Sequence, residues 1–290
     1  MRTLLKFALV LLAAASIAGC SGARLAYNNA DTVVRWMADD YFALEGVQLD
    51  DFKGRLAAFH AWHRSEELPR YSTLLTNAGQ KLADGMAVHE LAWAWDHVWA
   101  RYRRMAARAA PELALVLPTL TPAQFDRLEK RFTESGVEFR KKFLKGSETE
   151  QRKRRDKRNL ELMREWFGDL SVEQEAKIRL ASAKLPLLYA LRLQNRQRRQ
   201  SEFIALLKAY PSAAELEPRL LHWLTNWEEG ASLEYRRESD LHRELYIQML
   251  LELDRSLTPE QRAHAVTRLN EYAELFTVLA AQGRQARSDF

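Results

Sequence analysis

Three copies of one short pattern constrain the fold of this chain more than any other feature. A leucine, a hydroxyl residue, two further residues and a glutamine occur at Leu120–Gln124, Leu170–Gln174 and Leu257–Gln261. This spacing is typical of a capping box. In a capping box, the hydroxyl accepts a hydrogen bond from the backbone N–H of the third helical residue, and the glutamine side chain accepts one from the backbone N–H of the cap residue. Pro122 and Pro259 occupy the first helical position, where proline loses no hydrogen bond. Each copy therefore predicts the start of a helix.

Apolar residues at helical spacing follow these starts and fill the segments between them. Two examples are the sets Phe125, Leu128, Phe132, Phe139 and Val266, Leu269, Ala273, Phe276, Ala280. Aromatic residues recur in the same way over 50–67 and 86–108, and Pro69 predicts a helix start. The 290 residues include only 11 glycines and 8 prolines, and no stretch alternates like a strand. We expect an all-α fold, an elongated or curved bundle of about ten helices.

The chain also repeats at longer range. Glu67–Leu75 is echoed by Lys184–Leu193, and the residues after Thr121 are echoed by those after Thr258. The second pair of echoes is spaced more widely, which places extra residues in 213–254. The echoes indicate an internal duplication with halves at about 45–145 and 165–285. The alternative is that unrelated helices use the same favourable cap, which contributes about 1 kcal/mol.

The first twenty residues have the layout of a secretory signal. Arg2 and Lys6 are followed by an apolar run over 7–12 and by small residues up to Ala18. The run is too short to span a bilayer, which needs about 20 apolar residues. Cys20, the single cysteine of the chain, comes directly after this stretch.

The residues Ile17–Cys20 resemble the lipobox of bacterial lipoproteins. That resemblance implies cleavage before Cys20, a diacylglycerol on its sulfur and an acyl chain such as palmitate on the new amino group. The expected organisation is a signal peptide at 1–19, a lipidated tether at 20–27 and an all-α domain at 28–290. Each buried CH₂ contributes about 0.8 kcal/mol, so two or more chains anchor stably. An ordinary signal cleaved near Ala18 would instead leave a free thiol.

Ser21 follows the cysteine, and in lipoproteins an Asp at that position commonly retains the protein in the inner membrane. The resemblance therefore implies an outer-membrane lipoprotein that faces the periplasm.

Two wider resemblances add to this. The whole chain resembles a family of uncharacterised bacterial lipoproteins, through the lipobox, the sequence of Tyr27–Phe42, LPRY at 68–71 and the LTPxQ elements. The LTPxQ elements alone are similar to those of the Spy/CpxP periplasmic stress proteins, helical cradles that hold unfolded envelope proteins. The second resemblance implies a chaperone-like activity.

Several clusters of side chains are candidates for chemistry. Asp39 and Asp40 are adjacent, but neighbouring helical residues point about 100° apart and do not form a dyad by spacing alone. His60, His63 and Glu67 lie near one helical face and include residue types that bind zinc. The zincin pattern is absent, so packed or surface histidines are the favoured interpretation.

His89 and His97 flank Trp93, with Asp96 beside the second histidine, and this arrangement is typical of a core or interface stripe. No nucleophile elbow, P-loop or dinucleotide fingerprint occurs. We expect no enzyme activity, no catalytic or metal site and no cofactor. A hydrolase whose catalytic residues are scattered in the sequence stays open as a third hypothesis.

Two basic clusters, at 140–158 and 192–200, are the strongest charge features. They are candidates for contact with anionic lipid head groups or acidic proteins, since each basic residue contributes about 1 kcal/mol near an anionic membrane. The candidate contacts are Arg152, Lys153, Arg154, Arg155, Lys157, Arg158, Arg196, Arg198 and Arg199. The alternative is a solvated helical face that Glu148, Glu150 and Asp156 partly neutralise.

The net charge of +5 for 290 residues is too small to indicate nucleic-acid binding. We expect most of the eight tryptophans to lie in the core. Taken together, the sequence predicts a lipid-anchored envelope protein whose partners are the membrane, through its acyl chains, and other envelope proteins. The favoured function is a non-catalytic, chaperone-like helical cradle, and the alternative is a structural or assembly subunit of an envelope complex.

Overall fold

The computed structural model describes residues 22–288, so the expected signal peptide and Cys20 lie outside the described residues. Within this range the chain is almost entirely helical and contains no strand, which confirms the all-α expectation. The α-helices are α2 (Ala30–Phe42), α3 (Gly46–Trp62), α4 (Leu68–Ala83), α5 (Val88–Val116), α6 (Pro122–Phe143), α7 (Glu148–Phe167), α8 (Val172–Lys184), α9 (Tyr189–Ala209), α10 (Ala213–Thr225), α11 (Leu233–Asp254) and α12 (Pro259–Ser288).

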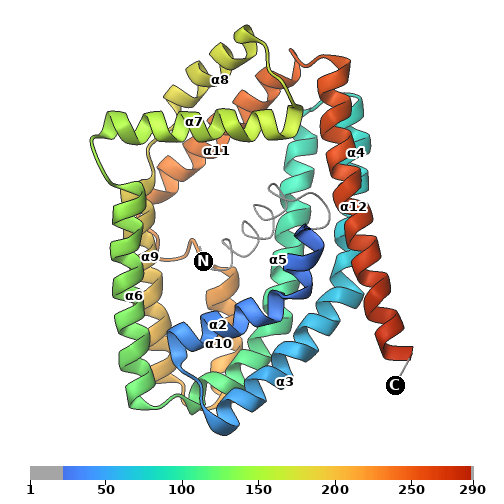
Figure 1. The fold of residues 1–290 in the computed structure, drawn as a ribbon. Coiled ribbons are helices and arrows are strands. Elements are labelled where there is room, and N and C mark those ends of the chain that lie inside the picture. Colours follow the sequence, from blue (N-terminus) through green and yellow to red (C-terminus); the bar gives the residue numbers. More distant parts are fainter. Residues whose placement is uncertain (1–21, 289–290) are drawn as a thin grey trace.

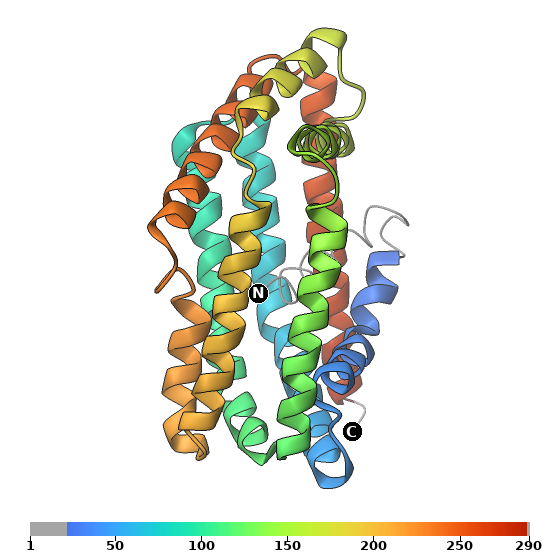
Figure 2. The same ribbon diagram turned by 90° about the vertical axis from the view of Figure 1, so that its left-hand side faces the viewer.

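The helices are arranged as a frame (Figure 1). Helix α6 forms the left side of that view, α7 crosses the top, α12 forms the right side and α2 lies near the bottom. The turned view shows a second layer, with α5, α9, α10 and α11, to the left of the layer that contains α2, α6 and α12 (Figure 2). The contact of α6 with α9 joins the two layers, α10 packs along α5 within the second layer, and α4 packs along α12.

The three predicted capping boxes are confirmed. Thr121, Ser171 and Thr258 accept the backbone N–H of the residue three positions later, at 3.4, 3.2 and 3.2 Å. The glutamine side chains accept in return from the cap N–H groups, at 2.8, 2.9 and 3.0 Å. Helices α6, α8 and α12 begin immediately after these caps, as expected.

The helices follow a similar order in the two parts of the chain. Helices α2, α3 and α4 precede a long α5 and then α6, whereas α7, α8 and α9 precede two helices, α10 and α11, and then α12. The segment 213–254, in which we expected extra residues, therefore holds two helices where the earlier part has one. The internal duplication, with halves at about 45–145 and 165–285, stays a prediction.

The largest core cluster joins α2, α5, α6, α9 and α10. Ala106, Ala110 and Ala114 are buried on one side of α5, and their small side chains let α10 approach closely with Leu216 and Leu220. Because these residues fall at helical spacing of four, they form one continuous stripe along α5. The stripe explains why the second half of α5 is fixed in the layer behind α2.

The expectation that most tryptophans lie in the core is wrong. None of the eight is fully buried, and Trp36 and Trp95 keep 70% and 51% of their surface exposed. The buried core consists mainly of leucine and alanine, with a few Phe, Tyr and Met side chains. In a frame of helices most elements are covered on one side only, so a large indole ring extends past the covered region.

We expected a separate helix to start at Pro69, but the chain is already helical before this residue. The chain stays helical from Gly46 to Ala83, and a π-helix at His63–Glu67 joins α3 to α4. Pro69 lies in the first turn of α4, directly after this π-helix. A π-helix widens the backbone and leaves i→i+4 donors unused, so a proline is tolerated close to it.

Candidate functional sites

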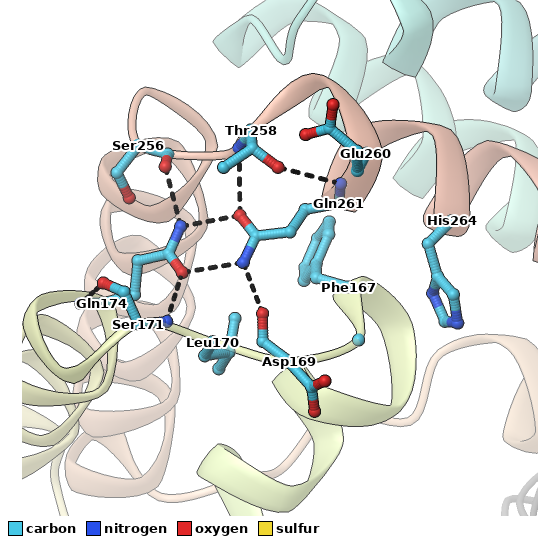
Figure 3. Close-up of a pocket in the computed structure, with 11 residues that line it drawn as sticks. Phe167, Asp169, Leu170, Ser171, Gln174, Ser256, Thr258, Glu260, Gln261 and His264 are labelled. Carbon is cyan, nitrogen blue, oxygen red and sulfur yellow. Dashed lines mark hydrogen bonds between the residues drawn. The ribbon is translucent and has the colours of Figure 1, made fainter.

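Two of the capping boxes meet at one point, near the top of the frame, where α8 and α12 begin (Figure 3). The side-chain amides of Gln174 and Gln261 bond to each other in both directions, with both N···O distances 2.8 Å. We call this contact the upper junction. It links residues 87 positions apart in the chain.

Each amide of the upper junction also bonds to the chain that precedes the opposite box. Gln174 Nε2 donates to the carbonyl of Ser256 at 2.7 Å, and Gln261 Nε2 donates to the carbonyl of Asp169 at 2.6 Å. Each amide oxygen also accepts a hydrogen bond from the backbone N–H of its own cap residue. Each glutamine side chain therefore donates two hydrogen bonds and accepts two, which satisfies all of its polar groups. Gln174 is only 4% exposed, so this network is buried on one side.

A shallow pocket of about 800 Å³ lies beside the upper junction. Its walls include Phe167, His264 and the polar residues Asp169 and Glu260 (Figure 3). His264 Nδ1 lies 3.0 Å from the carbonyl of Trp166, and the junction amides are already fully bonded. The junction amides are therefore not available to a ligand, and the polar side chains that line the pocket around them include Asp169, Glu260 and His264.

The third box takes part in an equivalent contact at the bottom of the frame, the lower junction. Gln124 Nε2 donates to Gln48 Oε1 at 2.9 Å and to the carbonyl of Ala43 at 2.9 Å. Gln48 Nε2 in turn bonds to the carbonyl of Thr119 and approaches Gln124 Oε1 at 3.4 Å. Every acceptor carbonyl lies two residues before the partner's cap position, as in the upper junction.

The lower junction reveals a fourth copy of the pattern that the sequence analysis missed. Leu44–Gln48 has the leucine and the glutamine, but Glu45 stands at the cap and makes no side-chain cap bond. This copy does not match the pattern because the pattern requires a hydroxyl residue directly after the leucine. The signal that finds it is the Leu-x-x-x-Gln spacing alone, immediately before a helical stretch.

A buried cluster surrounds the π-helix. His63 Nδ1 lies 2.8 Å from Tyr27 Oη, and the Tyr27 ring packs against His60 with centroids 5.0 Å apart. Burial, together with the nearby His60 and Arg64, lowers the pKa of His63 to about 4, and burial also lowers the pKa of His60. Both histidines are therefore neutral near pH 7.

Glu67, at the end of the π-helix, is fully buried beside arginines. Its Oε1 lies 2.5 Å from Arg104 Nε, and its Oε2 lies 3.6 Å from Arg101 Nη1. The structure thus directs Glu67 to Arg104 and His63 to Tyr27, and does not gather them with His60 into one ligand set. In the described part of the chain, no group of three or more His, Cys, Asp or Glu side chains is placed to hold a metal ion.

The other candidates for chemistry lie on ordinary helical surface. Asp40 pairs with Arg131 at 2.7 Å, and its neighbour Asp39 belongs to the same helix, α2. His97 Nδ1 lies 2.8 Å from the carbonyl of Trp93, whose ring it contacts. His89 is exposed near the start of α5.

Two of the nine predicted basic contacts are buried. Arg155 is 5% exposed and donates to the carbonyl of Leu185 at 2.7 Å. Arg199 is 9% exposed, lies 3.9 Å from the ring centroid of Trp223 and has a pKa lowered to about 10 by burial. Both arginines bind backbone carbonyls inside the protein, so they are not available as surface contacts for a membrane or a partner protein.

The remaining seven are more accessible but differ in their bonds. Arg152, Arg196 and Arg198 are half-buried and bond to Glu148, Ser135 and Glu202, respectively. The exposed ones are Lys153, Arg154, Lys157 and Arg158. These four project from one helix, α7.

A stripe of exposed and half-buried apolar and aromatic side chains follows the first half of α5. Val88, Trp95 and Val98 keep 62%, 51% and 56% of their surface exposed. Trp99 stacks against Trp95 and Tyr102, with centroid distances of 6.4 and 4.9 Å. We call these five residues the aromatic stripe.

Trp99 of the aromatic stripe also contacts an arginine and a further tryptophan outside the stripe. The guanidinium of Arg103, which is exposed, lies 5.6 Å from the ring centroid of Trp99. Trp227, in the connection between α10 and α11, packs against the same ring with centroids 5.1 Å apart. The spacing of 88, 95, 98 and 102 corresponds to one face of a helix.

Comparison with known proteins gives a family. Residues 40–236, more than half of the chain, match a family of unknown function (DUF6279). The match contains the lower junction and Gln174 but ends before Gln261. No curated protein and no solved structure is significantly similar to the chain. Among the described helices, none combines the length and the apolar character needed to cross a membrane. The extent of the match shows that this chain belongs to the family DUF6279.

Proposed function

We propose that this protein is a lipid-anchored protein of the bacterial cell envelope, attached to the outer membrane through Cys20, that binds other envelope proteins in a chaperone-like manner without catalysis. The lipobox at Ile17–Cys20 supports the anchor. The aromatic stripe on α5 is the single observation that carries the binding function.

The aromatic stripe has the properties of a binding surface for an apolar protein segment. Exposed apolar side chains at helical spacing fit an amphipathic or extended segment of a partner. Trp, Tyr and Arg are the residue types that contribute most binding energy at protein interfaces, and Trp95 and Arg103 supply two of them at exposed positions. Trp99 already contacts the rings of Tyr102 and Trp227, so little side-chain entropy is lost when a partner binds.

The first experiment measures suppression of aggregation of a chemically unfolded client by the chain that begins at Ser21. We expect suppression at stoichiometric amounts, and a loss of most of it in the double variant Trp95→Ala/Val98→Ser. The matched control is Val172→Ser, which alters an equally small apolar side chain, 81% exposed, on α8. Wild-type protein without any effect on the client would remove the chaperone-like function.

The same variants distinguish the chaperone-like function from the alternative, a structural or assembly subunit of an envelope complex. A structural or assembly subunit would use the aromatic stripe for one permanent partner and would form a complex of fixed stoichiometry. Trp95→Ala/Val98→Ser would then abolish that complex and leave client aggregation unaffected. The anchor is tested independently by mass spectrometry of the mature N-terminus, where an unmodified Cys20 would contradict it.

A further inference from the structure

The residues that follow the predicted lipid attachment point are not a free tether. Residues 22–28 are helical, and Ala23 and Tyr27 are buried, at 6% and 5% exposure. They pack against Leu68 at the start of α4 and against Leu279 of α12. The expected tether at 20–27 is therefore wrong for its described part, which is a short N-terminal helix packed on the body.

Covalent geometry limits how far the attachment point lies from this helix. Consecutive Cα atoms are about 3.8 Å apart, so Cys20 lies no more than about 7 Å from Gly22. A flexible tether of eight residues would instead have a mean span of roughly 15 Å and would allow the body to rotate freely. Lipid chains on Cys20 would thus place the N-terminal helix at the depth of the head groups.

Tyr27 fixes the N-terminal helix to the body through the π-helix. Its hydroxyl bonds to His63, its ring contacts His60, and the guanidinium of Arg64 lies 5.2 Å from its ring centroid. Arg64 also donates to Asn28 Oδ1 at 2.7 Å. These contacts come from the last turn of α3 and the start of the π-helix, so the N-terminal helix cannot swing away without breaking several of them.

The outer side of the N-terminal helix has the chemistry of a membrane contact. Leu25 is 66% exposed, and Arg24 beside it is exposed and cationic. An apolar side chain gains from partial burial between acyl chains, and an arginine gains about 1 kcal/mol near anionic lipid. A basic and apolar pair at the point of attachment is complementary to a bilayer surface.

From these observations we propose that the body is seated directly on the bilayer that carries its anchor, with Arg24 and Leu25 in the head-group layer. The inference rests on the proposed lipidation of Cys20. It differs from a tethered arrangement because the short connection and the Tyr27 contacts fix which side of the body faces the lipid. The occupant of this surface is the phospholipid layer itself.

The test uses purified lipidated protein in vesicles of phosphatidylethanolamine and phosphatidylglycerol. Because the sulfur of Cys20 is alkylated, an engineered cysteine is the one reactive thiol and accepts an environment-sensitive fluorophore. Leu25→Cys reports on the proposed contact, and Val172→Cys, 81% exposed on α8, is the matched control. We expect a blue-shifted emission, and at least threefold quenching by spin-labelled lipid, for Leu25→Cys alone.

A second variant tests the role of the short connection. Ten Gly and Ser residues inserted between Ser21 and Gly22 should leave acylation unchanged and return the Leu25→Cys label to a water-like emission. A water-like label without the insertion, or a label that the insertion does not change, would overturn the seated arrangement. Mass spectrometry of the same samples separates the two proposals, since unacylated protein contradicts the anchor and acylated protein with a water-like label contradicts the seating alone.

Discussion

The upper and lower junctions use one geometry with different residues. In both, two glutamines at the third position of a helix bond to each other and to a carbonyl two residues before the opposite cap. The upper junction has a hydroxyl at both caps, Ser171 and Thr258, and the lower junction has one, Thr121, opposite Glu45. The upper amide bonds are both 2.8 Å, whereas one of the lower pair lengthens to 3.4 Å.

This difference separates two roles of one motif. The hydroxyl satisfies a local backbone N–H and starts the helix, and the glutamine ties that start to a second helix far along the chain. The lower junction keeps the second role where one hydroxyl is missing, so the long-range contact does not depend on a complete capping box. A capping box whose glutamine had no partner on a second helix would stabilise the start of its own helix and nothing else.

The largest expected effect follows from removing a buried amide. Gln174→Ala should lower the free energy of unfolding by about 3 kcal/mol, because the carbonyl of Ser256 and the amide of Gln261 lose their partner. Gln48→Ala should cost less than half as much, because Gln48 is only half-buried and water can replace it. Urea unfolding followed by circular dichroism measures both. Equal losses would contradict the ranking of the two junctions.

A pH series separates the junctions, which bond through neutral amides, from the Tyr27–His63 contact. The pKa of His63 is about 4 in the folded protein, below the ordinary value of 6.5, because burial disfavours its charged form. The unfolded chain therefore binds a proton first as the pH falls from 6.5 toward 4, and stability decreases over that window. We expect a loss on the order of 2 kcal/mol from this group, after a discount for its partial exposure.

The pH effect is measured by urea unfolding at pH 7 and pH 4.5 in the wild type and in His63→Gln. The variant retains a polar side chain at the position and lacks the titrating group, so it should lose about 2 kcal/mol less than the wild type. His242, whose pKa burial also lowers to about 4, is unchanged in both proteins and cancels in the difference. The same acid sensitivity in both proteins would refute this assignment.

The reciprocal bond of the upper junction is tested by a double-mutant cycle. Gln174→Ala and Gln261→Ala remove the same pair of hydrogen bonds, so the double variant should be about 1 kcal/mol more stable than the sum of the single losses predicts. Denaturant midpoints and slopes of the four proteins provide the coupling energy. Strict additivity would mean that the two amides act only on their own backbones.

The smallest expected effect restores the missing cap of the lower junction. Glu45→Thr supplies a hydroxyl that accepts a backbone N–H in the first turn of α3, and should raise the free energy of unfolding by about 0.5 kcal/mol. Glu45→Ala is the matched control, since it removes the same carboxylate and adds no acceptor. A gain of equal size in the control would indicate relief of charge rather than capping.

The sequence predicted the parts of the fold that depend on neighbouring residues. The three capping boxes and the all-α class follow from local spacing, because a cap acts within four residues. The fourth copy at Leu44–Gln48 was missed, because Glu45 hides the local signal. The buried positions of Arg155 and Arg199 were missed as well, since a run of basic residues does not show which members turn inward.

The helix starts, the single cysteine in its lipobox-like setting and the absence of known catalytic motifs were thus fixed by the sequence itself, since each depends on a few adjacent residues. Only the tertiary structure decided which helix starts pair, that residues 22–28 pack on the body, and that Val88, Trp95 and Val98 of the aromatic stripe stay exposed. Those outcomes depend on contacts between residues dozens of positions apart, whose energies are set by burial and by distance in space rather than by order along the chain.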